Sequence, residues 1–255
     1  MTTIRRRPVL CMIAGLIAVL SACAGGPQYV PVDIQDRSTT LYSVRAEWHP
    51  RTQTTGTNGT VVKDGIEVQY TRVSGKDDQE LLAGQAIAVG GRSIIGPQLV
   101  SHRIDISYAH IAYSGTARFT GENPVEMDAF LGAGRVDFRL QSSATTSAPL
   151  TLETEQVDYA LTMGLGLRWW FFANSAVEGR LILLTANPFS YFAGTFGKGG
   201  QTDMLEGELA LVFRPIGNVA IRGGYALMDL TPKKSSNSSF DFKLSGPFLG
   251  LGILF

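Results

Sequence analysis

Apolar residues recur at every second position along most of the chain, in blocks of ten or more residues. In the clearest block, residues 157–172, Val157 and Trp169 share one face with six further apolar residues, while Asp158 and Arg168 lie on the other face. A period of two predicts β-strand. Strands of soluble sheets usually have about five or six residues, whereas about 9 to 11 residues of tilted strand cross a bilayer. The pattern therefore predicts long strands that cross a membrane.

The same alternation recurs on both sides of this block, and it sets the predicted fold class. Only a closed ring of strands satisfies every backbone donor and acceptor in lipid, so the sequence predicts an all-β, antiparallel transmembrane β-barrel. Eight strands are expected. Ten is the alternative if residues 41–49 and 85–91 add two more, and nine is excluded if both barrel ends lie in the periplasm. Besides 157–172, the expected strands include residues 65–73, 103–115, 130–140, 205–214 and 219–227, and a last strand that ends at Phe255.

Connections of two lengths alternate toward the C-terminus. Short ones are expected at residues 173–175 and 215–218, and long ones at 143–155, 188–201 and 231–239. Small outer-membrane barrels combine short periplasmic turns with long external loops, so the short turns are expected on the periplasmic side. Aromatic residues near these turns and at the terminus predict a girdle at that membrane surface: Trp169, Phe171, Phe213 and Phe255.

The last strand carries a further signal. The final residues alternate strictly, with Leu249 and Phe255 on the same face. This ending closely resembles the terminal signal by which the outer-membrane assembly machinery recognises its substrates, which implies that machinery as a partner. Upstream, Phe242 and Phe248 have the opposite parity, which predicts a bulge or a change of phase near residues 246–247.

The chain opens with a secretory signal. Three arginines at residues 5–7 precede twelve apolar residues from Val9 to Leu20, a run too short for a retained membrane helix, which needs about 20 residues. The next stretch, LSAC at residues 20–23, resembles the bacterial lipobox at all four of its positions. In that family the signal, here residues 1–22, is removed. Cys23 would then carry a diacylglycerol and usually an amide-linked acyl chain such as palmitate.

An ordinary signal-peptidase site, with Cys23 incidental, is the alternative. The other cysteine, Cys11, leaves with the signal, so the mature chain has no internal disulfide, and its lone cysteine stands where a lipid would be attached. The lipobox resemblance also implies the outer membrane of a Gram-negative cell, because Ala24 replaces the aspartate that commonly retains lipoproteins at the inner membrane. Residues 23–40 are then expected to form a lipidated periplasmic tether, and 41–255 the barrel, whose first strands are left open within 41–100.

Composition agrees with one domain that faces lipid. Charged residues make up 17% of the chain, below the roughly one quarter that is typical of soluble domains. Without the three arginines of residues 1–22, the chain keeps 19 basic residues against 22 acidic ones. A nucleic-acid partner would require a basic patch, so none is expected.

Charged residues lie on the face of the predicted strands opposite the apolar one, and they are expected to fill the lumen. An eight-stranded barrel has an interior only wide enough for its own side chains, so we expect a salt-bridged plug, with an ion-conducting lumen as the alternative. Seven arginines and six acids have this parity: Arg103, Arg135, Arg139, Arg168, Arg180, Arg214 and Arg222, with Asp105, Asp137, Asp158, Glu178, Glu206 and Glu208.

Catalysis is not expected from the motifs. Residues 105–114 bring Asp105, Ser107 and His110 close in sequence, which suggests a hydrolase constellation. In a strand, however, Asp105 and Ser107 point to one side and His110 points to the other. No metal-ligand spacing or cofactor motif stands out, so the sequence predicts no catalytic, cofactor-binding or metal-binding residue. Cys23 is the single candidate site, for lipidation.

Over residues 60–255 the chain resembles small bacterial outer-membrane β-barrels of the opacity and adhesin-like type, here with a lipoprotein signal in front. The resemblance implies a cell-envelope protein that contacts outer-membrane lipids and acts through its structure or its surface loops, without catalysis. A lipid-modifying enzyme of the outer membrane and a narrow channel are the alternatives. The surface ligand is not identified by the sequence.

Overall fold

The computed structural model of the protein describes residues 28–30, 32–36, 39–55, 60–144, 150–185, 202–232 and 240–254. This part of the chain is all β. No helix in it is long and apolar enough to cross a membrane. Its strands are β1 (Gln28–Tyr29), β2 (Val32–Ile34), β3 (Thr40–Thr55), β4 (Thr60–Leu81), β5 (Gln85–Val89), β6 (Arg92–Ile95), β7 (Gln98–Phe119), β8 (Val125–Ala144), β9 (Leu150–Phe172), β10 (Ser175–Thr185), β11 (Asp203–Ile216), β12 (Val219–Thr231) and β13 (Phe240–Leu254).

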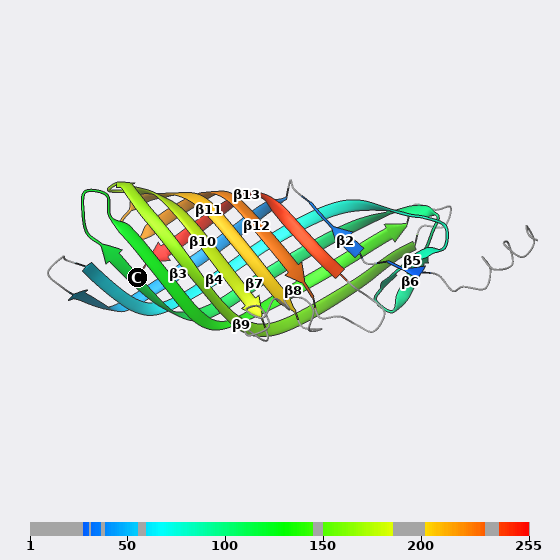
Figure 1. Ribbon diagram of the computed structural model, residues 1–255, viewed down its shortest axis with the longest axis horizontal. Helices are drawn as coiled ribbons and strands as arrows, with labels where there is room; N and C mark the ends of the chain where they lie inside the picture. The colour runs from blue at the N-terminus through cyan, green and yellow to red at the C-terminus, as the bar shows by residue number, and fades with distance from the viewer. Residues whose placement is uncertain are drawn as a thin grey trace, which may run out of the picture.

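Nine of these strands form a closed ring (Figure 1). The order is β3, β4, β7, β8, β9, β10, β11, β12 and β13, and each neighbouring pair is antiparallel except the closing pair of β13 and β3, which is parallel. The sequence predicted eight strands, or ten. The stretch 41–49 does join the ring as part of β3, but 85–91 does not: it forms β5 and the turn after it, in a separate small sheet.

Because the ring has an odd number of strands, its first strand starts at one end of the ring and its last strand stops at the other end. The chain enters β3 at the end that also holds the longest connections, after β4, β10 and β12, and it leaves β13 at the end with the short turns. We call these the long-connection end and the short-turn end. The prediction that both termini of the barrel lie on one side is therefore wrong for this ring. Nine strands were excluded because both barrel ends were expected in the periplasm, whereas the parallel pairing of β13 with β3 closes a ring with an odd number of strands.

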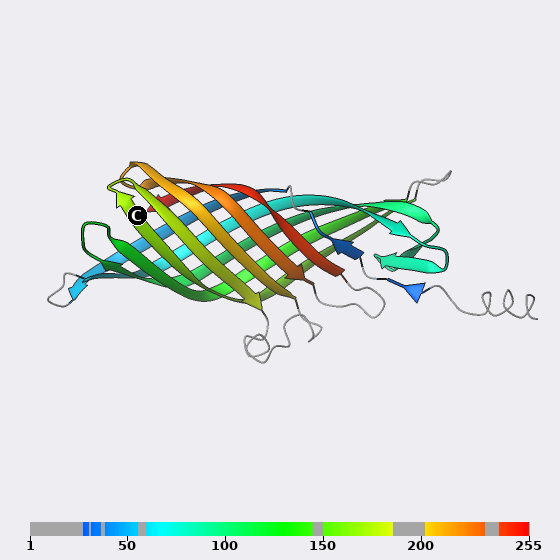
Figure 2. The same ribbon diagram turned by 45° about the horizontal axis from the view of Figure 1, so that its top comes forward.

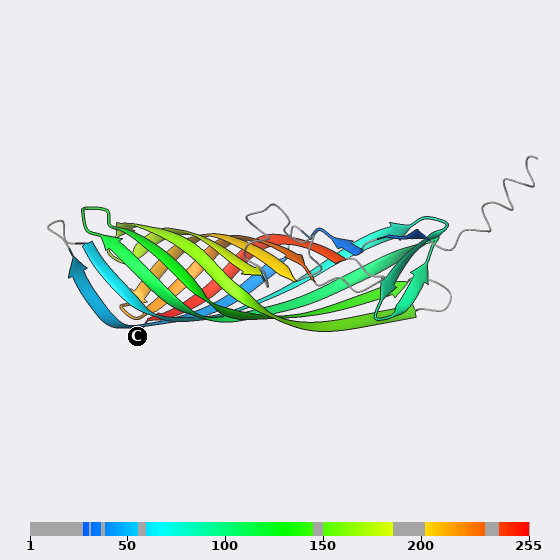
Figure 3. The same cartoon turned by 60° about the horizontal axis from the view of Figure 1, so that its bottom comes forward.

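The segment before the ring is not a free tether where it is described. β2 pairs with Phe240–Phe242 of β13, ahead of the stretch of β13 that pairs with β3, and Val32 and Ile34 are buried. β1 pairs with β5, which continues into β6 through Gly90 and Gly91, both at positive φ as a tight hairpin turn requires. This three-stranded sheet lies at the long-connection end (Figure 3).

Two local predictions are corrected. β13 pairs with β12 without a register shift, so there is no bulge near residues 246–247: Phe242 and Phe248 simply point inward. The long connection predicted at residues 143–155 is mostly strand, because β8 continues to Ala144 and β9 begins at Leu150. The signal at residues 1–22, the lipobox with Cys23, the predicted loop at 188–201 and the terminal Phe255 lie outside the described residues.

The alternation reverses part of the way along six strands: β4, β7, β8, β9, β12 and β13. In the half of these strands next to the long connections, apolar side chains point inward and polar ones outward; in the half next to the short turns the relation is reversed. We call these the long-connection half and the short-turn half (Figure 2). β3, β10 and β11 keep apolar residues on the outward face along nearly their whole length. The inward apolar cluster of the long-connection half includes Val73, Val100, Ile104, Ile106, Val136, Phe138, Leu140, Met228, Leu230, Phe240, Phe242 and Leu244.

Candidate functional site

An apolar surface surrounds the short-turn half. Asp64 is the only charged residue among its described outward positions, and the Tyr113 hydroxyl donates to Asp64 Oδ2 at 2.8 Å. We call this surface the outer band. Most strands contribute nine residues or more, enough for a tilted strand to cross a bilayer, which needs about 9 to 11. The ranges are 42–48, 62–70, 109–119, 125–133, 157–169, 177–183, 205–213, 219–227 and 247–253.

Aromatic side chains mark both edges of the outer band. Tyrosines lie toward its long-connection edge, and tryptophan and phenylalanine lie toward its short-turn edge, all at least 46% exposed. Such residues are enriched where a membrane meets water. The tyrosines are Tyr42, Tyr70, Tyr159 and Tyr225; the others are Trp48, Phe119, Trp169, Phe172 and Phe213. Phe171, expected in this girdle, is half-buried between Trp169 and Phe172.

Inside the same half, charged side chains gather around Glu178 on β10. Its carboxylate accepts hydrogen bonds from Arg45 at 3.1 Å, from Arg168 Nε at 2.7 Å and from Arg222. Arg168 also donates to Glu126 at 2.9 Å, and Arg222 donates to Glu208 at 2.6 Å. These groups come from six different strands, so the cluster ties the ring together across its interior.

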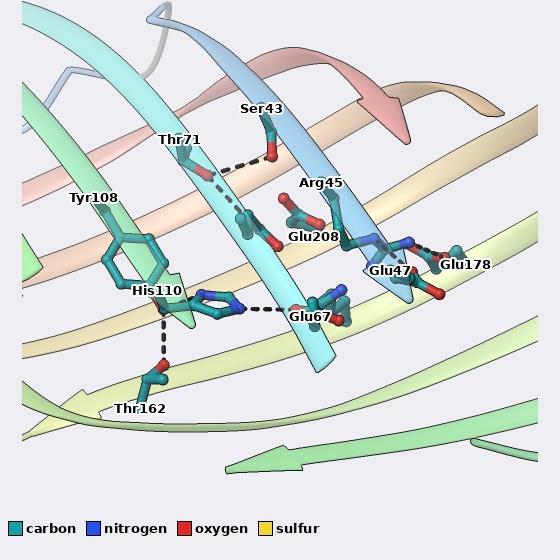
Figure 4. Close-up of polar contacts among 12 residues, drawn as sticks. Ser43, Arg45, Glu47, Glu67, Thr71, Tyr108, His110, Thr162, Glu178 and Glu208 are labelled. Atoms are coloured by element: carbon teal, nitrogen blue, oxygen red, sulfur yellow. Dashed lines mark hydrogen bonds and ion pairs between the residues drawn. The ribbon is translucent and has the colours of Figure 1, made fainter. Parts of the chain in front are cut away.

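A second cluster surrounds His110 on β7 (Figure 4). His110 Nε2 lies 2.8 Å from Glu67 Oε1, and Arg180 also donates a hydrogen bond to this oxygen. The Tyr108 hydroxyl contacts His110 Nδ1 and lies 2.7 Å from the Thr162 hydroxyl. The ring of Phe130 stacks on the imidazole, with centroids 5.2 Å apart. His110 is therefore held on both nitrogens in a buried polar contact chain.

The predicted lumen charges divide by strand. Inward and buried are Arg168, Arg180, Arg222, Glu178, Glu206 and Glu208, while Arg214 and Asp158 are inward and half-buried. The prediction is wrong for β7 and β8, where Arg103, Arg135, Arg139, Asp105 and Asp137 face outward. Their opposing residues, such as Phe138, fill the interior instead. The mistake has one cause: the charges were assumed to face inward over the whole length of each strand.

The hydrolase constellation is not assembled. Asp105 and Ser107 face outward and His110 faces inward, as strand parity predicted. Reasoning from sequence missed Arg45 and Glu67 as interior charges, because the strands that carry them were not assigned a parity. The alternation of apolar and charged residues in 41–49 and 65–73 was the available signal.

Packed side chains occupy the described interior. Apolar residues fill it in the long-connection half, and the charge clusters fill much of the short-turn half. A polar cavity of about 260 Å³ remains at the short-turn mouth, lined by Glu47, His49, Lys63, Arg118 and Arg214 among others. Among the described residues, no group of three or more His, Cys, Asp or Glu residues could hold a metal ion.

Comparisons with protein-family models, with curated proteins and with solved structures give no match. Function is therefore inferred from the geometry of the ring, its outer band and its interior.

Proposed function

We propose that the protein is an outer-membrane lipoprotein whose short-turn half spans the bilayer, and that it acts structurally or through its surface, without catalysis. The outer band is the observation that carries this proposal. Arginine and glutamate side chains fill the interior behind it, which is the reverse of a water-soluble β-protein. Exposed leucines such as Leu165, Leu209 and Leu211, each above 60% exposed, would be costly in water but are suited to lipid.

The packed interior favours a structural role over a channel. A conducting path would have to pass the ion pairs around Glu178 and then the apolar cluster with Phe138 and Phe242. Ions do not cross an apolar, side-chain-filled segment. His110 contacts Glu67 and the Tyr108 hydroxyl, but all of these groups are buried inside the ring and not at a rim that a lipid substrate could reach, so this geometry gives the enzyme alternative no support.

Lipidation of Cys23 is retained as part of the proposal, but the lipid moves from the periplasmic side of the membrane to the opposite side. The start of β3 lies at the long-connection end, and β1 and β2 lie with it. If the short turns face the periplasm, a lipid on Cys23 would insert from the cell exterior, into the outer leaflet. Cys23 lies five positions before Gln28 of β1, and a chain of that length reaches at most about 18 Å.

The first test is electrophoresis of detergent-extracted protein, with and without boiling, together with flotation of reconstituted vesicles at alkaline pH. A heat-dependent shift in mobility and flotation that survives Cys23→Ser would support a ring inserted in the bilayer. A soluble β-domain held by its lipid alone would show no mobility shift, and Cys23→Ser would release it from the membrane. That result would end the proposal.

The orientation of the ring in the membrane is tested with a matched pair of variants. Arg92 at the long-connection end and Asn174 at a short turn are both exposed. Each is changed to cysteine in turn and treated with an impermeant maleimide on intact cells. We expect Arg92→Cys to react in intact cells and Asn174→Cys only after lysis. The opposite result would reverse the orientation and would place the lipid on the periplasmic side.

A further inference from the structure

Two cavities meet on the outer wall at the long-connection edge of the outer band. The first is an apolar groove of about 410 Å³, which runs across β10, β11, β12 and β13. Its lining includes Leu181, Leu205, Gly207, Leu227 and Ser245. The groove is continuous with the outer band, so its apolar wall lies where the acyl chains of a bilayer would begin.

The second cavity is polar and has a volume of about 690 Å³. Three cations line it: Arg72 and Lys76 on β4, and Arg103 on β7. Two acids line it as well, but both are engaged. Asp36 accepts the backbone N–H of Lys76 at 3.0 Å, and Asp105 pairs with Arg103 at 3.4 Å. The lining therefore has an excess of one positive charge, three cations against two acids, and in the described part of the chain no ion pair forms on the side chain of Arg72 or Lys76.

A backbone contact joins the two cavities. Ser245 lines the groove, Asp36 lines the polar cavity, and the Ser245 N–H donates to the Asp36 carbonyl oxygen at 2.8 Å. The contact lies at the seam where the segment after β2 runs beside β13 (Figure 2). Tyr42, an edge tyrosine of the outer band, lines the polar cavity. The cavity would therefore lie at the surface of the membrane, where such tyrosines are enriched.

We propose that this seam binds one phosphorylated membrane lipid, with an acyl chain in the groove and the phosphate beside Arg72 and Lys76. The proposal rests on the proposed function, because it requires the outer band to lie in a bilayer. Charge complementarity selects the headgroup: phosphate oxygens accept charge-assisted hydrogen bonds from guanidinium and ammonium groups. The apolar groove selects a lipid over a free anion.

The test uses native mass spectrometry of the full-length protein in detergent micelles, with phosphatidylglycerol or diacylglycerol added as the probe. We expect retention of one phosphatidylglycerol and little diacylglycerol, which has the acyl chains but no phosphate. The double variant Arg72→Gln with Lys76→Gln should weaken phosphatidylglycerol binding about tenfold or more. The charge-matched control is Arg92→Gln with Arg135→Gln, because both residues lie outside the two cavities.

The groove is tested separately with a matched pair of glycines. A Cβ atom at Gly207 or at Gly179 would meet no atom within 4 Å, so both positions accept a side chain, but only Gly207 lines the groove. We expect Gly207→Phe to reduce lipid retention about tenfold, the effect of losing one acyl-chain contact surface, and Gly179→Phe to leave it unchanged.

Three results would overturn the assignment. The first is equal retention of the two lipids, and the second is equal binding by the wild type and the Arg72/Lys76 variant. The third is displacement of the lipid by inorganic phosphate with no effect of Gly207→Phe, which would leave only a soluble-anion site. The same preparation is scored for heat-dependent mobility and flotation. Loss of lipid specificity in a protein that still floats would count against the site and leave the proposed membrane insertion standing.

Discussion

Six strands of the ring, β4, β7, β8, β9, β12 and β13, run through both halves, and their two halves have opposite polarity. β7 shows the contrast within one strand: in the short-turn half Ile111 faces outward and His110 inward, whereas in the long-connection half Arg103 faces outward and Ile104 inward. A β-strand has two faces, and the surrounding solvent decides which one must be apolar. The reversal within single strands therefore indicates two different surroundings for one continuous sheet.

The difference also predicts what stabilises each half. In the short-turn half the interior is held by ion pairs and hydrogen bonds, with Glu178 at their centre. In the long-connection half it is held by buried apolar area, at roughly 25 cal/mol per Å². Substitutions of one kind should therefore act differently in the two halves, and each comparison below tests that expectation.

The largest effect is expected from Glu178→Ala. Its carboxylate forms ion pairs with three arginines, and all four side chains are at most 7% exposed. Removing one partner of a buried ion-pair cluster leaves uncompensated charge and typically costs about 3 to 5 kcal/mol. The measurement is the temperature at which half of the protein loses its compact electrophoretic mobility. The control is Glu155→Ala, an exposed acid on β9; equal losses would show that the interior cluster does not stabilise the ring.

A somewhat smaller effect is expected from an outward arginine. Leu209, 61% exposed, lies in the middle of the β11 part of the outer band. An arginine on the lipid face near the midplane costs about 2 to 4 kcal/mol, so Leu209→Arg should reduce the assembled, heat-modifiable fraction in membranes. Gln141→Arg, at an exposed outward position of the long-connection half, should have little effect. If both variants assemble like the wild type, lipid does not surround the outer band.

Much of the ring follows from the sequence. Period-two alternation placed the long strands 157–172, 205–214 and 219–227, because this local pattern is strong. The alternation could not show the reversal of faces, since a strand such as 103–115 reads equally well with either face inward. Phe242 and Phe248 were a sign of this reversal, because they are apolar residues on the face opposite to Leu249. In one strand alone, however, a bulge was the simpler interpretation.

The strand count and the interior sites depended on long-range contacts. β3 closes the ring only through its parallel pairing with β13, about two hundred residues away, and no local pattern encodes such a partner. The same is true of Arg45, whose ion pair with Glu178 joins residues 133 positions apart. Strand parity did predict that His110 and Ser107 point to opposite sides, because that relation is local.

A smaller effect comes from matched isoleucines on β7. Ile104 is fully buried in the long-connection half, whereas Ile111 is 58% exposed on the outer band. Ile104→Val should lower the free energy of unfolding by about 0.5 to 1.5 kcal/mol, the usual cost of a methylene in a packed core. Ile111→Val should change it by less than about 0.5 kcal/mol. Melting of both variants in detergent checks this, and a larger loss for Ile111 would reverse the assignment of faces.

The smallest effect is expected from pH, through His102 on β7 in the long-connection half. It is buried, with Nδ1 2.8 Å from the Ser142 hydroxyl and Nε2 3.2 Å from Gln79 Oε1. Burial lowers the pKa of His102 below its usual 6.5, although Asp77 and Asp78 act in the opposite direction. The unfolded chain therefore takes up a proton before the folded one does. Stability should be constant above pH 6.5 and fall as the pH drops below it.

His102→Gln retains hydrogen-bonding capacity without this titration, so its stability should depend less on pH than that of the wild type. The measurement is the difference in melting temperature between pH 7.5 and pH 5.5 for the two proteins in the same detergent. Titrating groups shared by both proteins cancel in this comparison. An identical pH dependence would mean that His102 is protonated equally in the folded and unfolded chains. Water would then have to reach the apolar interior of the long-connection half, and the contrast between the two halves would be weaker there.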